Sequence, residues 1–173
     1  MLNVSNFLSI VRIILIIPMS FALINEYLTL ALIIAILAYI TDLLDGYLAR
    51  KLNQITELGK ILDPLADKMM LASIVIILLY QSKIPFWFGA VLIGRDLLIL
   101  LGGLMIKNKI KYVPASNLIG KITIDVIGIT LVGIVFNIPY FDIYGPVVST
   151  IFVIISLFVY FVNNLKLIKN ENT

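Results

Sequence analysis

Six apolar segments, each long enough to cross a lipid bilayer, make up most of this sequence. They occupy residues 8–24, 28–50, 60–81, 85–106, 115–136 and 145–166. A spanning helix needs about 20 mainly apolar residues. Because lipid offers no hydrogen-bond partner to an open strand edge, each segment is predicted to be helical. We therefore predict an all-α, polytopic membrane protein with six transmembrane helices, built as a single membrane-embedded domain over residues 1–173.

The composition agrees with lipid as the main solvent. Hydrophobic residues make up 61% of the 173 residues, mean hydropathy is +1.10, and only 13% are charged. A soluble domain is usually about 45–50% apolar, so a soluble fold of this size could not bury the excess. Cysteine and histidine are absent, which excludes disulfides, zinc–thiolate sites and imidazole catalysis. Catalysis must therefore come from Asp, Glu, Lys, Arg, Tyr or hydroxyl side chains.

Basic residues are unevenly distributed over the predicted connections. They gather after the second segment, after the fourth and in the C-terminal tail, at Arg50, Lys51, Lys60, Lys107, Lys109, Lys111, Lys166 and Lys169. The connections on the other side carry only Lys83. By the positive-inside rule, both termini and the basic connections are predicted to face the cytoplasm of a cell membrane.

Four aspartates lie at helical spacing on either side of one basic connection. Asp42 and Asp45 are three residues apart, and Asp63 and Asp67 are four apart. Each pair therefore shares one face of its predicted helix. A hairpin through the connection lets both faces meet near its cytoplasmic end. Carboxylates gathered at low dielectric repel one another, so such a site must take up either protons or cations.

The residues around these aspartates favour divalent metal ions and a diphosphate. Oxygen-only ligands suit Mg²⁺, Mn²⁺ or Ca²⁺ rather than zinc. Four carboxylates can hold two ions as a clamp suited to displacement at phosphorus. Gly46 and Ala49 share the Asp42 face and leave room for a ligand, and Arg50 can pair with a diphosphate. The alternative is that the aspartates only cap helix ends or contact interfacial water.

These residues resemble the motif of the CDP-alcohol phosphotransferase family, D-x2-D-G-x2-A-R-x8-G-x3-D-x3-D. All eight fixed positions match at the family spacing, namely Asp42, Asp45, Gly46, Ala49, Arg50, Gly59, Asp63 and Asp67. The resemblance implies two divalent metal ions, Mg²⁺ or Mn²⁺, held by the four aspartates. It also implies a homodimer in the lipid bilayer whose active site opens toward the cytoplasm.

The resemblance also implies individual roles. Asp67 is expected to act as the base that deprotonates the acceptor hydroxyl. Residues without bulky side chains and one arginine are expected to contact the CDP moiety: Gly46, Ala49, Arg50 and Gly59. The expected reaction transfers a phosphatidyl group from CDP-diacylglycerol to an alcohol and releases CMP, as a step of phospholipid biosynthesis.

Two further stretches are similar to particular branches of the family. Residues 62–68 look like the corresponding string of phosphatidylglycerophosphate synthases and of CMP-forming cardiolipin synthases. The N-terminal run is similar to the N-x-L-T-x2-R-x5-P pattern of the same branches. Asn6, Leu8, Arg12 and Pro18 match it, and Ser9 replaces the threonine. Both stretches indicate a glycerol-based acceptor.

Arg95 and Lys121 are the candidate residues for binding an acceptor phosphate. Arg95 matches an arginine on the fourth helix of phosphatidylglycerophosphate synthases, and residues 120–123 are similar to their Gly-Lys-x-Thr pattern. Glycerol 3-phosphate is therefore the expected acceptor. The structural alternatives are an ion pair of Arg95 with Asp96 or Asp125, and a Lys121 side chain that only reaches for water.

Other functions remain possible from the sequence. The Arg95-Asp96 pair resembles the cardiolipin synthase branch, so a CMP-forming cardiolipin synthase that uses phosphatidylglycerol is the main alternative. A small ion transporter would explain the buried acidic residues, although not the spacing of Gly46, Ala49 and Arg50. A non-catalytic subunit with a degenerate site is a further alternative. No nucleic-acid partner is expected.

Overall fold

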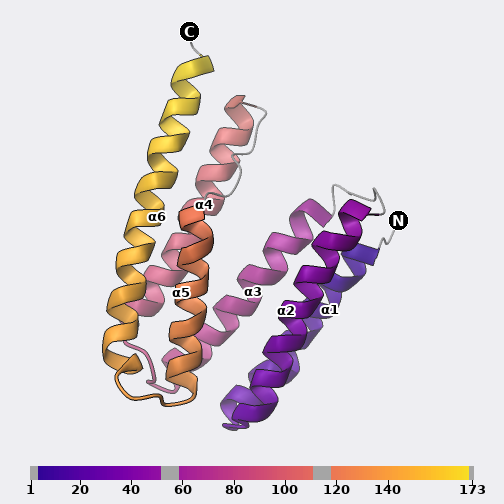
Figure 1. Cartoon of the computed structure of the whole chain (residues 1–173), viewed down its shortest axis with the longest axis vertical. Helices are drawn as coiled ribbons and strands as arrows, with labels where there is room; N and C mark the ends of the chain where they lie inside the picture. Colours follow the sequence, from indigo (N-terminus) through magenta and orange to yellow (C-terminus); the bar gives the residue numbers. More distant parts are fainter. Residues whose placement is uncertain (1–3, 52–58, 111–117, 172–173) are drawn as a thin grey trace. The chain divides into compact units, whose positions relative to one another are not determined.

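Each apolar segment of the sequence forms one α-helix, and together six helices account for most of the described chain (Figure 1). The computed structural model describes the backbone of residues 4–51, 59–110 and 118–171, and side chains over 6–44, 59, 62–102 and 118–163. The helices are α1 (Val4–Ile24), α2 (Leu28–Lys51), α3 (Gly59–Tyr80), α4 (Phe86–Ile110), α5 (Leu118–Val135) and α6 (Phe141–Glu171). The all-α prediction is confirmed.

The largest difference from the predicted boundaries is at α6. This helix begins at Phe141 rather than near 145 and runs on to Glu171, past the predicted end at 166. Asp142 lies in its first turn, where a carboxylate interacts favourably with the positive end of the helix dipole. The apolar run alone therefore underestimated the length of α6, because the first and last turns of this helix carry polar residues.

The chain divides into two compact units, Met1–Gln81 and Ser82–Thr173. In the first unit, α1 packs against both α2 and α3. Buried aliphatic side chains such as Leu23, Ile34 and Leu78 form its core. The Gln81 side chain at the end of the unit donates a 2.9 Å hydrogen bond to the Leu23 carbonyl. The α1 helix therefore packs against both helices that carry the aspartate motif.

In the second unit, α6 packs against α5 and α4. Thr130 and Ser149 are both buried and share a 2.9 Å hydrogen bond between α5 and α6. Gly145 is in close contact with the same threonine, since a Cβ atom there would lie 2.7 Å from the Thr130 methyl group. Small and hydroxyl-bearing residues thus let these helices approach closely, as is common where helices pack in membranes.

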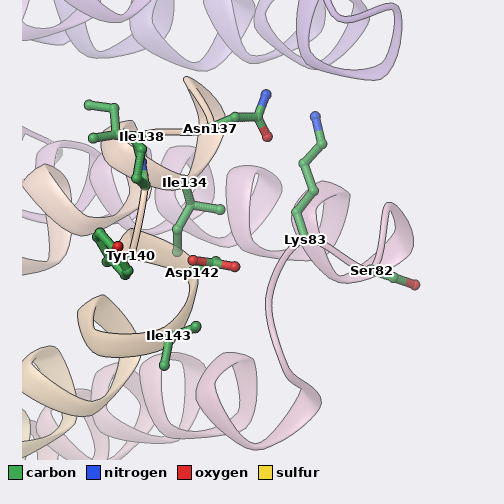
Figure 2. Close-up of a pocket in the computed structure, with 9 residues that line it drawn as sticks. Ser82, Lys83, Ile134, Asn137, Ile138, Tyr140, Asp142 and Ile143 are labelled. Carbon is green, nitrogen blue, oxygen red and sulfur yellow. The ribbon is translucent and has the colours of Figure 1, made fainter.

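A cavity of about 490 Å³ lies at the connections that precede α4 and α6 (Figure 2). Lys83, Asn137 and Asp142 supply polar groups to its wall, and Ile134 and Ile143 supply apolar surface. None of its lining residues belongs to the aspartate motif.

Among the described residues, three helical stretches are long and apolar enough to cross a membrane: Asn6–Ile24, Leu118–Val135 and Phe141–Asn163. Many large apolar side chains on these helices are exposed, including Ile17 at 72% and Phe158 at 69%. Such surfaces are costly in water and favourable in lipid. The chain is therefore a helical protein with membrane-spanning character, while six spans and cytoplasmic termini stay predictions.

Candidate active site

The motif occupies the C-terminal part of α2 and the N-terminal part of α3. The α2 helix carries the first five motif positions and α3 the last three, beginning with the buried Gly59. The side chains of Asp45, Gly46, Ala49 and Arg50 lie outside the described residues. Their predicted contacts with metal and CDP therefore stay predictions, and the described part of the site consists of Asp42, Gly59, Asp63 and Asp67.

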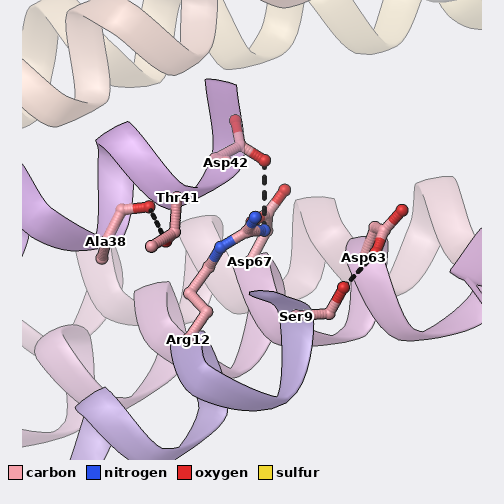
Figure 3. A network of polar contacts seen from close by, with 7 residues as sticks. All are labelled: Ser9, Arg12, Ala38, Thr41, Asp42, Asp63 and Asp67. Carbon is pink, nitrogen blue, oxygen red and sulfur yellow. Dashed lines mark hydrogen bonds and ion pairs between the residues drawn. The ribbon is translucent and has the colours of Figure 1, made fainter. Parts of the chain in front are cut away.

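A buried arginine from α1 joins the two halves of the motif (Figure 3). The Nη1 atom of Arg12 lies 3.1 Å from Asp42 Oδ1 and 2.5 Å from Asp67 Oδ1. Arg12 is only 2% exposed, whereas the two carboxylate side chains are 44% and 54% exposed. The structure thus brings Asp42 of α2 and Asp67 of α3 together on one cation.

A serine from the same helix contacts the third described aspartate. The Ser9 hydroxyl donates a hydrogen bond to Asp63 Oδ1 (Figure 3). Ser9 is fully buried and precedes Arg12 by three residues, so both side chains lie on one face of α1. This face of α1 therefore positions carboxylates from both motif helices.

The burial of Arg12 is an electrostatic constraint on the site. A guanidinium removed from water costs several kcal/mol unless opposite charges and hydrogen bonds compensate for it. Asp42 and Asp67 supply that compensation through charge-assisted contacts. Because both carboxylates remain about half exposed, they stay accessible to a ligand while they neutralise the arginine.

The arrangement of Asp42 and Asp67 fits a bound cation. One oxygen of each carboxylate contacts the same nitrogen atom of Arg12. The guanidinium therefore marks a position at which the carboxylates of α2 and α3 can bind one positive ion together. Over the described residues, no group of three acidic side chains is placed to hold one metal ion. The side chain of Asp45 lies outside that search, so the four-aspartate ligand set stays a prediction.

The two predicted acceptor residues belong to the second unit. Arg95 on α4 is 9% exposed, and its Nη1 atom lies 2.7 Å from Asp96 Oδ1. Of the two ion pairs considered as alternatives for Arg95, the one with Asp96 is therefore present. Its buried Nε atom has no hydrogen-bond partner among the described residues. Lys121, near the start of α5, is exposed.

Sequence reasoning gave no chemical role to Ser9 or Arg12. Ser9 was only a position of an N-terminal pattern, while Arg12 also stood out as a basic residue inside an apolar segment. A signal was present, because an arginine within an apolar membrane segment is costly and usually faces a polar partner. What the pattern could not provide was the identity of that partner.

Comparison with known proteins agrees with the motif. The model of the CDP-alcohol phosphatidyltransferase family matches residues 2–162. A CDP-diacylglycerol–glycerol-3-phosphate 3-phosphatidyltransferase of Aquifex aeolicus is 32% identical over 98% of this chain and 100% of its own length. A Bacillus subtilis protein of the same name is 34% identical over 81% of this chain and 76% of its own.

A more distant similarity links the chain to another branch. A CMP-forming cardiolipin synthase of Streptomyces coelicolor is 35% identical over 53% of this chain and 42% of its own length. The family match covers both compact units and all eight motif positions. The chain belongs to the CDP-alcohol phosphatidyltransferase family.

Proposed function

We propose that this protein transfers the phosphatidyl group of CDP-diacylglycerol to glycerol 3-phosphate, forming phosphatidylglycerophosphate and CMP. The observation that carries the proposal is the complete eight-position motif, whose Asp42 and Asp67 meet on a single cation. End-to-end similarity to a relative named for this reaction supports the choice of substrates.

The four motif aspartates are proposed to hold two divalent ions, Mg²⁺ or Mn²⁺. Such ions supply charge neutralisation for a diphosphate undergoing displacement. Around them, Gly46, Ala49 and Gly59 are proposed to leave room for the CDP moiety. Arg50 is proposed to pair with its phosphates in a forked geometry.

Asp67 is proposed to accept the proton of the acceptor hydroxyl. The hydroxyl oxygen attacks the phosphorus on the lipid side of the diphosphate, and the bond from that phosphorus to the CMP oxygen breaks. CMP leaves with the bonding electrons, while the hydroxyl proton passes to the Asp67 carboxylate. Asp67 is suited to this role because it is half exposed at the motif and a carboxylate can serve as a general base.

Arg95 and Lys121 are proposed to bind the phosphate of glycerol 3-phosphate. A doubly charged phosphate in a partly desolvated site is very costly without fixed cations. Arg95 is buried with one donor atom, Nε, that has no hydrogen-bond partner among the described residues, and Lys121 is exposed on its helix. Both side chains therefore have donors to offer to an incoming phosphate.

The second candidate is a cardiolipin synthase that uses phosphatidylglycerol as acceptor. The observation in its favour is the Arg95–Asp96 ion pair, which leaves less positive charge for a free phosphate. Phosphatidylglycerol presents a neutral glycerol headgroup and requires fewer cations.

The membrane arrangement is part of the same proposal. All six helices are proposed to cross the cell membrane, with both termini and the active site at the cytoplasmic side, in a homodimer within the bilayer. The clustering of basic residues in alternate connections supports this orientation. One domain over residues 1–173 is proposed, and the family match across both compact units supports it.

An acceptor panel tests the function. Purified protein, CDP-diacylglycerol and Mg²⁺ are incubated separately with glycerol 3-phosphate, phosphatidylglycerol, inositol phosphate and serine, and CMP release is measured. We expect release with glycerol 3-phosphate, its loss in EDTA and its return with Mg²⁺ or Mn²⁺. Cardiolipin from phosphatidylglycerol, with no reaction of glycerol 3-phosphate, would replace the first candidate by the second. Full turnover in EDTA would contradict the two-metal mechanism.

A further inference from the structure

We propose that Arg12 is a positioning residue that serves as the counter-cation of the Asp42–Asp67 pair in the metal-free protein, so that divalent ions bind there in competition with its guanidinium. This inference rests on the proposed function, because it assumes that these carboxylates bind metal. It adds a third helix, α1, to a site whose motif lies entirely on α2 and α3.

The contacts of Arg12 place one cation between carboxylates from two helices. A single nitrogen, Arg12 Nη1, is in contact with both carboxylates, at 3.1 Å and 2.5 Å. Asp42 and Asp67 come from different helices and are separated by 24 intervening residues of sequence. Two carboxylates so placed repel each other without a cation between them. The guanidinium therefore stabilises the arrangement that a metal ion also requires.

Arg12 and the two carboxylates differ in their exposure to solvent. Arg12 is almost completely buried, while the two carboxylates are about half exposed. The guanidinium thus reaches the pair from the protein interior, and the solvent-accessible side remains open to an entering ion. A divalent ion bound by the same carboxylates lies close to a positive charge. Because like charges repel and the local dielectric is below that of water, the ion and the guanidinium compete.

A purely structural role predicts the opposite effect on metal binding. If Arg12 only preorganised the carboxylates, its removal would let α2 and α3 separate and would weaken binding. If it competes, its removal strengthens binding and makes the metal-free protein less stable. The direction of the change in metal affinity therefore distinguishes the two roles.

The test compares Arg12→Gln with the wild type and with Lys83→Gln. Lys83 is a basic residue of the second unit and lies outside the motif. Mn²⁺ binding is measured by electron paramagnetic resonance on detergent-purified full-length protein, and the Tm is measured in EDTA and in saturating Mn²⁺. Neither readout depends on turnover.

We expect Arg12→Gln to lower the Kd for Mn²⁺ roughly ten- to a hundredfold, the scale of a lost charge-assisted hydrogen bond. Its Tm should fall in EDTA, and Mn²⁺ should raise the Tm by more than in the wild type. Lys83→Gln should match the wild type in the Kd for Mn²⁺ and in the size of the Tm increase that Mn²⁺ produces. An unchanged or higher Kd for Arg12→Gln would overturn the inference and leave the proposed metal site intact.

Two other outcomes are also decisive. If the wild type binds no Mn²⁺, the metal site of the proposed function fails, and this inference fails with it. If Arg12→Gln does not fold, Arg12→Met replaces it, because a methionine fills the buried space with an adaptable apolar side chain and carries no charge. A Kd below that of the wild type then supports competition, and an equal or higher Kd overturns it.

Discussion

The hydroxyl of Ser9 on α1 donates a hydrogen bond to the Asp63 carboxylate on α3, across 54 positions of the sequence. Ser9 is fully buried, whereas Asp63 is only partly so. Together with Arg12, this serine makes α1 a support for the carboxylates of the motif. The contact is long-range, and its removal should affect the site without touching any motif residue.

Ser9→Ala is expected to lower the free energy of unfolding in EDTA by about 1–2 kcal/mol, because a partly buried carboxylate oxygen loses its donor. Ser73→Ala is the matched control on α3, since the Ser73 hydroxyl donates to the Met70 carbonyl of its own helix. The free energy of unfolding of both variants is measured in a series of detergent mixtures. Equal losses of unfolding free energy in the two variants would mean that the Ser9–Asp63 hydrogen bond stabilises the protein no more than a hydrogen bond within one helix.

Asp67→Asn should reduce kcat by at least about a hundredfold, the usual scale for losing a general base. The substitution keeps the size of the side chain but removes its capacity to take a proton. Asp125→Asn on α5, where Asp125 is exposed, is the control and should retain turnover. CMP release under saturating substrates provides the measurement. Near-normal turnover of Asp67→Asn would assign the proton to another group.

Arg95→Ala and Lys121→Ala are each expected to raise the KM for glycerol 3-phosphate roughly ten- to a hundredfold, since each removes a charge-assisted contact with the phosphate. The KM for CDP-diacylglycerol should stay unchanged. Initial rates over a range of both substrates separate the two effects, with Lys83→Ala as the control. An unchanged KM for glycerol 3-phosphate in Arg95→Ala would show that Arg95 only forms its structural ion pair with Asp96.

Gly133→Ala should destabilise the second unit by about 1–3 kcal/mol, the usual cost of overpacking. A Cβ atom at Gly133 would overlap the Phe141 ring, so the start of α6 would have to shift. Gly128→Ala, on the same helix, is the matched control, because a Cβ atom there meets nothing within 4 Å. It should be neutral or stabilising by up to about 1 kcal/mol. Similar stabilities for both variants would contradict the close packing of α5 on Phe141.

The helices could be predicted from the sequence because their cause is local. The length of an apolar run and the need to satisfy the backbone in lipid require a helix wherever the run occurs. The second segment was predicted at 28–50, and α2 spans Leu28–Lys51. The family could likewise be predicted, because the eight fixed positions lie at a set spacing within one short stretch of sequence, residues 42–67.

The partners of the charged residues could not be predicted in this way. Arg95 had two candidate partners in sequence, Asp96 and Asp125, and only the packing of its side chain decided for Asp96. Arg12 had none assigned. Its contacts with Asp42 and Asp67 arise because α1 packs against both α2 and α3.

Six helices, their approximate ends and the family could thus be predicted from the amino acids alone, since these depend on residues close together in the chain. The support that α1 gives to the motif, with Arg12 between two carboxylates and Ser9 on a third, followed from the packing of the helices. A buried charge requires compensation by opposite charge, but this requirement does not specify which of several distant carboxylates supplies it. Helix packing makes that choice.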